Sequence, residues 1–192
     1  MSLTVILSFV VTTIISALMI PLVIKAGNQL GILAHMNKRT VHKHEIARIG
    51  GYAIYLSSLI GSALFLKADH QINAIMVAGF IIFMVGLYDD SHDLSPKVKL
   101  IFEVIAALIV IVYGEIYIKG FGYFPSDAMT FLSGVVTLFW IVGITNAINL
   151  IDGLDGLSAG ISIIVLVTIS MTSLLSGRSD IASLSLILAG SI

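Results

Sequence analysis

The chain has 192 residues, of which 58% are hydrophobic and 11% charged, and its formal net charge is −1 at pH 7. Average soluble domains carry about a quarter charged residues, and a soluble core of this size could not bury so much apolar surface. A net charge near zero gives no electrostatic basis for binding nucleic acid, so no nucleic-acid partner is expected. The absence of cysteine excludes disulfides, thiolate metal sites and a cysteine nucleophile.

Apolar runs follow one another along the whole chain, and a membrane helix needs roughly 20 apolar residues. Six such runs are predicted, at about 3–24, 50–66, 72–88, 98–118, 128–145 and 157–175. A seventh begins near Ile181 and reaches Ile192, which is too short to cross a bilayer. We therefore predict an all-α integral membrane protein, a single transmembrane domain over 1–192 in the lipid bilayer. It would have six transmembrane helices and a truncated seventh.

The basic residues predict the orientation, because Lys and Arg gather on the cytoplasmic side of membrane proteins. Seven of the ten lie in the segments after the first and third runs, and three lie in segments on the opposite side. This asymmetry places the N-terminus outside and predicts cytoplasmic segments at about 25–49, 89–97 and 146–156. The first run lacks a basic segment before it and is longer than a signal-peptide core, so we expect a retained helix.

Two adjacent carboxylates, Asp89 and Asp90, follow the third run, with Asp93 three residues further on. Neighbouring carboxylates repel each other unless a cation lies near them. Mg²⁺ is typically held by one or two carboxylates together with substrate phosphates. The pair is therefore a candidate anchor for Mg²⁺ and a diphosphate. A solvated helix end, where acids mark the water boundary, is the alternative interpretation.

Four polar residues recur at every third position after the fifth run, namely Asn146, Asn149, Asp152 and Asp155. On a helix this spacing predicts a polar stripe along one side. The glycines that follow each Asp leave room for a ligand to approach the backbone. Asn can recognise a nucleobase or a sugar, and Asp can hold a metal or a ribose hydroxyl. The alternative is a polar seam between packed helices.

Basic side chains in the first two cytoplasmic segments are candidates for holding phosphates or anionic head groups. Orientation of the chain by its positive charges is the alternative explanation for them. Glu103 follows Lys99 by four residues, and this spacing predicts an ion pair along one helix. The candidates for substrate binding in these segments are Arg39, His42, Arg48, Lys97 and Lys99.

The pattern DDxxDL at Asp89–Leu94, followed after the fifth run by NxxNxxDGLDGL at 146–157, resembles the polyprenyl-phosphate N-acetylhexosamine-1-phosphate transferases. RxxH at Arg39 and RxGG at Arg48 resemble the branch that uses UDP-GlcNAc. The stretches 95–99 and 114–123 are similar to the bacterial members that act on undecaprenyl phosphate. The similarity covers the whole chain. Members of the family are longer, so we expect this chain to be about the N-terminal half of an enzyme.

The resemblance implies transfer of GlcNAc-1-phosphate from UDP-GlcNAc to undecaprenyl phosphate, with release of UMP. This would be the first membrane step of O-antigen or cell-envelope polysaccharide synthesis, at the cytoplasmic face of a bacterial inner membrane. It implies Mg²⁺ as cofactor, with Mn²⁺ left open, held by Asp89 and Asp90, one of which would also be the base. Asn146 and Asn149 would bind substrate. The implied catalytic residues are Asp89, Asp90, Asp152 and Asp155.

Two readings from other classes remain open at this point. One is a catalytically inactive, truncated paralogue that acts as a membrane binding or scaffold protein. The other is a transporter, which would place its carboxylates in mid-span; here they cluster at the ends of apolar runs. Another UDP-aminosugar and a homodimer also remain open.

Overall fold

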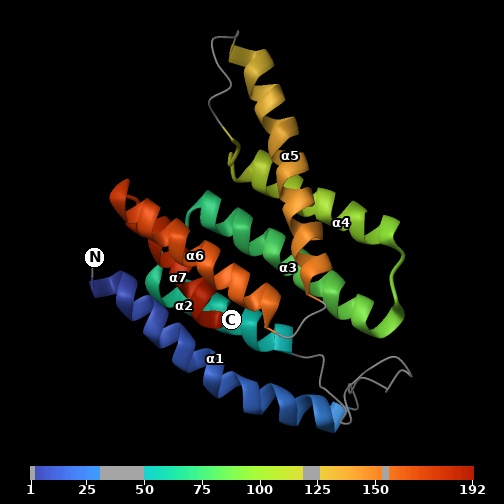
Figure 1. Cartoon of the computed structure of the whole chain (residues 1–192), viewed down its shortest axis with the longest axis vertical. Helices are drawn as coiled ribbons and strands as arrows, with labels where there is room; N and C mark the ends of the chain where they lie inside the picture. The colour runs from blue at the N-terminus through green and yellow to red at the C-terminus, as the bar shows by residue number, and fades with distance from the viewer. Residues whose placement is uncertain (1–2, 31–49, 119–125, 153–155) are drawn as a thin grey trace. The chain divides into compact units, whose positions relative to one another are not determined.

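A computed structural model of the chain describes residues 3–30, 50–118, 126–152 and 156–192 (Figure 1). Every regular element in these ranges is a helix, so the all-helical prediction is confirmed for this part of the chain. Two compact units emerge, Met1–Lys67 with Ala159–Ile192, and Ala68–Ser158. The elements are α1 (Leu3–Leu30), α2 (Gly50–Phe65), α3 (His70–His92), α4 (Pro96–Leu108), the π-helical η1 (Ile109–Tyr113), α5 (Ser126–Ile151), α6 (Leu157–Leu175) and α7 (Ser179–Ser191).

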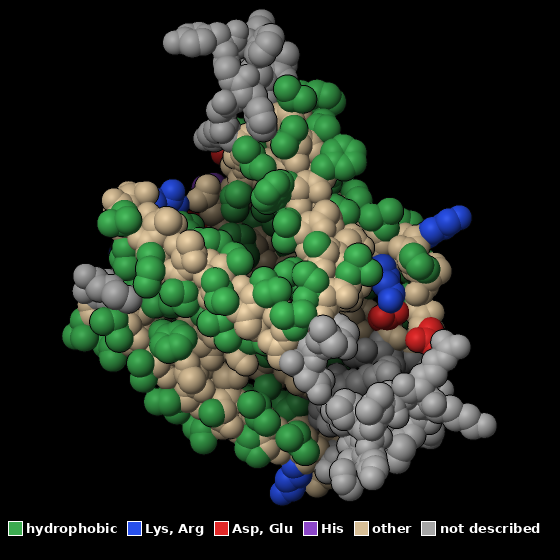
Figure 2. Space-filling view, in the orientation of Figure 1, with side chains coloured by type: hydrophobic (Ala, Val, Ile, Leu, Met, Phe, Trp, Pro, Cys, Tyr) green, Lys and Arg blue, Asp and Glu red, His purple; other side chains and the backbone are tan. Residues whose placement is uncertain are grey.

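Among the residues that the structure describes, four stretches are long and apolar enough to cross a membrane, namely Leu3–Gly27, His70–Asp89, Thr130–Ile151 and Leu157–Leu175. The helices α2 and α7 are apolar but shorter. Hydrophobic side chains are spread over the described surface in Figure 2, whereas charged side chains are few, as expected for a protein that faces lipid. These findings support an integral membrane protein. The six spans, the single transmembrane domain and the external N-terminus stay predictions.

Small residues allow α1, α2 and α7 to pack closely in the first unit. Ser8, Thr12 and Ser16 of α1 are buried, as are several serines of α2 and α7. The Ser16 hydroxyl donates a 2.8 Å hydrogen bond to the backbone carbonyl of Ser191, which joins α1 to α7. Helices in membranes associate through such small and hydroxyl-bearing residues, because the backbones can come close together.

Gly190 is the position where α1 and α7 have the least room. A Cβ placed there would lie 2.8 Å from the carbonyl oxygen of Phe9 and 2.9 Å from Oγ1 of Thr13. We expect Gly190→Ala to destabilise the protein by about 1–3 kcal/mol, since backbone atoms would have to move apart. Gly160→Ala on α6 is the matched control, because a Cβ there meets nothing within 4 Å. Thermal unfolding in detergent should show a lower midpoint for the first variant alone; equal midpoints would contradict the packing.

In the second unit, α3 and α4 form a hairpin whose turn is specified by the sequence. The Asp69 carboxylate caps the start of α3 by accepting from the backbone N–H of Ile72 at 2.8 Å. Asp93 ends α3 in the left-handed conformation, with φ of 47°, which Asp tolerates better than most residues. Pro96 then begins α4, a position where its missing N–H costs nothing. This turn brings the start of α4 back along the end of α3.

The predicted span at 98–118 is helical only as far as Tyr113, so the helical structure ends five residues earlier than predicted. Helix α4 gives way to the π-helical turn η1 and the chain leaves helical structure at Gly114. Gly114 is required there, since a Cβ would lie 2.6 Å from the Val110 carbonyl oxygen and 2.7 Å from the Cβ of Ala74. The backbone N–H of Ile118 then donates to Oγ1 of Thr137 on α5 at 2.8 Å. The helical structure thus ends where the chain contacts α3 and α5, although several of the residues that follow Gly114 are apolar.

Candidate functional site

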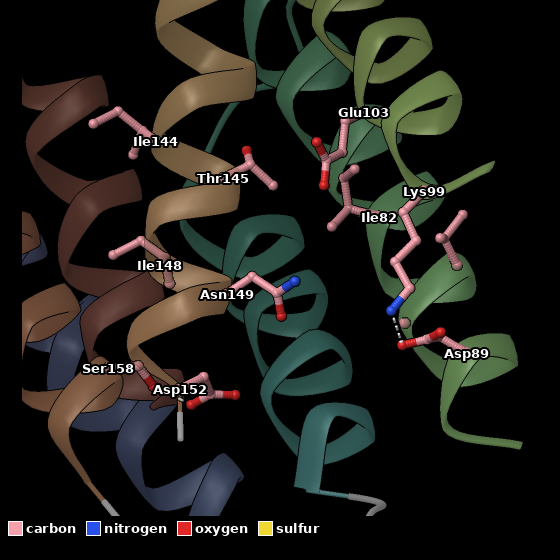
Figure 3. Close-up of a pocket in the computed structure, with 12 residues that line it drawn as sticks. Ile82, Asp89, Lys99, Glu103, Ile144, Thr145, Ile148, Asn149, Asp152 and Ser158 are labelled. Atoms are coloured by element: carbon pink, nitrogen blue, oxygen red, sulfur yellow. Dashed lines mark hydrogen bonds and ion pairs between the residues drawn. The ribbon is translucent and has the colours of Figure 1, made fainter. Parts of the chain in front are cut away.

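A cavity of about 480 Å³ lies between α3, α4 and α5, within the second unit (Figure 3). Apolar side chains from α3 and α5, such as Ile82 and Ile148, form part of its wall. Most of the polar side chains carry oxygen, and they face one another across the cavity in Figure 3. The polar lining consists of Asp89, Lys99, Glu103, Thr145, Asn149, Asp152 and Ser158.

Asp89 and Lys99 form an ion pair on one side of the cavity. Lys99 Nζ lies 2.6 Å from a carboxylate oxygen of Asp89, and the side chains are 31% and 27% exposed, respectively. The other carboxylate oxygen accepts the backbone N–H of Leu94 at 2.8 Å. Asp89 lies in the last turn of α3, where the helix dipole disfavours a negative charge. Lys99 compensates for that placement and ties α4 to α3.

Glu103 occupies the deeper part of the same wall and is only 8% exposed. Its carboxylate accepts a hydrogen bond from the side-chain amide of Asn146 on α5. The same amide nitrogen donates to the backbone carbonyl of Val142 at 2.9 Å. The predicted Lys99–Glu103 ion pair is therefore wrong. Lys99 pairs instead with Asp89 on α3, and Glu103 accepts from Asn146 on α5. Both contacts join different helices.

Asn149, in the last turn of α5, and Asp152, just after its end, form the opposite wall. The predicted segment 146–156 is helical as far as Ile151, so Asn146 and Asn149 lie on α5 itself. Asp152 follows the helix, with its backbone N–H bonded to the Ile148 carbonyl at 3.1 Å. Its carboxylate accepts the hydroxyl of Ser158 at the start of α6. The polar stripe expected from the three-residue spacing thus lines the cavity with Asn149 and Asp152.

Of the remaining predicted site residues, Lys97 is exposed and does not line the cavity. Asp90 belongs to the last turn of α3, but its side chain is outside the part of the structure that is described. Arg39, His42, Arg48 and Asp155 lie outside the described residues altogether.

Three polar lining residues were missed as site candidates, namely Glu103, Thr145 and Ser158. Thr145 lies one turn of helix before Asn149, so the helical period of the stripe contained a signal for it. Ser158 follows Asp152 by six residues in the sequence, and no spacing rule pairs such positions. Glu103 was interpreted from local spacing, although the residue that it contacts lies 43 positions away.

The chemistry of the cavity suits a hard cation or a phosphorylated ligand. Its donors are carboxylate, amide and hydroxyl oxygens, which are the types that Mg²⁺ prefers. Within the described part of the chain, no group of three or more Asp, Glu or His side chains is placed to hold a metal ion. The donor types thus fit Mg²⁺, and Asp89 and Asp152 place carboxylates on the two facing walls.

The fold and the site define an all-helical membrane protein with a polar cavity at the ends of two helices. Comparison with known proteins then identifies its family. Residues 72–192 match the sequence profile of glycosyl transferase family 4. The chain belongs to this family, which comprises polyprenyl-phosphate GlcNAc-1-phosphate transferases. The resemblance inferred from the motifs is thereby confirmed.

Several named bacterial proteins are similar to this chain along most of its length. A probable undecaprenyl-phosphate N-acetylglucosaminyl 1-phosphate transferase of Bacillus subtilis is 35% identical over 97% of the chain and 53% of its own length. The undecaprenyl-phosphate alpha-N-acetylglucosaminyl 1-phosphate transferase of Escherichia coli is 27% identical over 82% and 44%, respectively. A decaprenyl-phosphate N-acetylglucosaminephosphotransferase of Mycobacterium leprae is 34% identical over 77% and 40%. The chain thus spans about half the length of these relatives.

Proposed function

We propose that this chain carries part of the active site of an enzyme that transfers GlcNAc-1-phosphate from UDP-GlcNAc to undecaprenyl phosphate and releases UMP. The observation that carries the proposal is the cavity where Asp89, Lys99, Asn149 and Asp152 converge. The names of the similar proteins from B. subtilis and E. coli supply the substrate class. A bacterial inner membrane, with the cavity toward the cytoplasm, is the location that fits these substrates.

In this reaction an oxygen of the lipid phosphate attacks the β-phosphorus of UDP-GlcNAc, and the bond from that phosphorus to the bridging oxygen breaks. UMP leaves with the bridging oxygen. Such transfers need little covalent work from the protein, and they depend on positioning and on neutralising charge. Lys99 supplies a cation to the phosphates, and Asp89 holds Lys99 in place or accepts a proton from the attacking phosphate. Asn149 and Asp152 orient the nucleotide sugar from the opposite wall.

Mg²⁺ is the proposed cofactor, with Asp89 and Asp90 as its ligands on this chain and Mn²⁺ as an alternative ion. When bound, it would neutralise the oxygens of the diphosphate. The remaining predicted substrate contacts, by Asn146, Lys97, Arg39, His42 and Arg48, are retained as proposals, as is the catalytic role of Asp155. The proposed pathway is O-antigen or cell-envelope polysaccharide synthesis.

Release of UMP is the measurement that tests this function. The protein at its native length, in vesicles with undecaprenyl phosphate, should release UMP from UDP-GlcNAc only when Mg²⁺ is present. EDTA should abolish the release and added Mg²⁺ should restore it. UDP-GalNAc in place of UDP-GlcNAc tests the choice of sugar. The protein could bind the lipid phosphate without releasing UMP from either sugar nucleotide. That result would refute the proposed transferase activity and favour a membrane binding or scaffold protein.

A further inference from the structure

Glu103 stands out because a carboxylate is buried without a described cationic partner. A buried carboxylate is costly unless hydrogen bonds satisfy it. The described bond to Glu103 comes from the Asn146 amide, which reaches across from α5. Figure 3 shows the Glu103 carboxylate directed from α4 toward α5. An apolar residue would fill this place at lower cost if packing were its whole purpose.

The geometry connects Glu103 to both walls of the cavity. One turn earlier on α4, Lys99 bonds to Asp89 of α3, so α4 carries the link to each neighbouring helix. One turn after Asn146 on α5 comes Asn149, followed by Asp152 at the helix end. The Glu103–Asn146 hydrogen bond therefore acts on the part of α5 that bears the polar residues of the opposite wall.

Asn146 is well suited to be held in this way. Its amide nitrogen has two hydrogens, and the contacts to Glu103 and to the Val142 carbonyl employ both. A doubly bonded amide has one orientation, because flipping it would bring its oxygen against two acceptors. The bond is thus directional, which a contact between apolar side chains would not be.

We infer that Glu103 is a positioning residue of this site. It sets the placement of α5 against α4 and hence the separation between the Asp89–Lys99 pair and the Asn149–Asp152 wall. Phosphoryl transfer depends on this separation, since a misplacement of about 1 Å can cost about a hundredfold in rate. The inference rests on the proposed function for its effect on turnover, whereas its effect on helix placement is independent of that function.

A distance measurement and a rate measurement on the same variants test the inference. These 192 residues contain no cysteine. In the native-length protein, with any cysteine elsewhere replaced by serine, Leu100→Cys on α4 and Leu150→Cys on α5, both at exposed positions, can therefore carry the spin labels. We expect Glu103→Leu to broaden the distance distribution between the labels and to lower kcat for UMP release at least tenfold. Glu103→Gln keeps an oxygen that can accept from Asn146. It should retain a narrow distribution and at least tenfold more kcat than Glu103→Leu.

Thr137→Val is the matched control on α5. Thr137 is buried and bonds to backbone groups of Ser133 and Ile118, away from the cavity. This variant should lower the unfolding midpoint without changing the label distances or kcat. Equal broadening in Thr137→Val would overturn the inference, because general destabilisation would then explain it. Unchanged distances in Glu103→Leu would overturn it too, whatever happens to kcat.

If Glu103→Leu fails to fold, a reversal of the hydrogen bond decides the matter. Asn146→Asp places two carboxylates together and should broaden the distances. Adding Glu103→Gln lets the introduced amide donate to the introduced carboxylate, and the distribution should narrow again; failure to narrow would overturn the inference. If the unmodified protein releases no UMP, the proposed function fails, while the label distances still decide the role of Glu103.

Discussion

Asp89→Asn should lower UMP release by about a thousandfold while the protein remains in the membrane. The variant keeps an oxygen that can accept the Leu94 N–H, so the turn after α3 is preserved. It loses the negative charge that lies 2.6 Å from Lys99. Losing one preorganised electrostatic contact at a reacting centre costs about a hundred- to a thousandfold. Asp89 would additionally lose its capacity to bind Mg²⁺ or to accept a proton, which places the expected loss at the upper end.

A double variant separates catalysis from stability in this prediction. Asp89→Asn alone leaves Lys99 unpaired in a partly buried position and should cost about 1 kcal/mol of unfolding free energy. Adding Lys99→Met removes the unpaired charge and should restore the unfolding midpoint. UMP release should stay at least as low as in Asp89→Asn, because both residues belong to the proposed site. Thermal unfolding in detergent measures the stability of each variant, and UMP release from labelled UDP-GlcNAc measures its catalytic rate. Wild-type rates in Asp89→Asn would remove Asp89 from the mechanism.

Asp152→Asn should lower UMP release by about a hundredfold and leave the protein as stable as before, or slightly more stable. Asp152 follows the C-terminal end of α5, where the helix dipole repels a carboxylate. In the described part of the chain its side chain contacts the Ser158 hydroxyl and no cation. Removing the charge therefore relieves an unfavourable interaction. Residues that serve function at the expense of stability behave in this way.

The control for Asp152 is Ser158→Ala, which removes the hydroxyl that holds the carboxylate but keeps its charge. We expect a loss of about tenfold, since one orienting hydrogen bond is worth about 1–1.5 kcal/mol. The same UMP assay and unfolding measurement apply to both variants. A marked fall in the unfolding midpoint of Asp152→Asn would show that this carboxylate stabilises the fold, and would argue against a role in catalysis.

The sequence alone predicted most of the helices and four of the polar residues that line the cavity, namely Asp89, Lys99, Asn149 and Asp152. Apolar runs of sufficient length must become helices in a membrane, because the bilayer offers no partner for an open backbone. Acidic residues at the ends of such runs cost free energy in a membrane and are therefore expected to serve function. Asp89 and Asp152 could thus be identified from the sequence as candidate site residues. The recurrence of Asn146, Asn149 and Asp152 at every third position likewise predicted a shared face. Asn149 and Asp152 do line one cavity, whereas Asn146 bonds to Glu103.

Only the tertiary structure decided which side chains pair and where α4 ends. The four-residue spacing predicted an ion pair between Lys99 and Glu103. In the structure, the α3–α4 hairpin instead places Asp89 against Lys99. Helix α5 places Asn146 against Glu103. The sequence could not rank these partners, because a local ion pair contributes only a few tenths of a kcal/mol. Contacts between packed helices easily exceed that amount. Gly114 likewise ends the helical run through its fit against α3, a contact with Ala74 that lies 40 residues away.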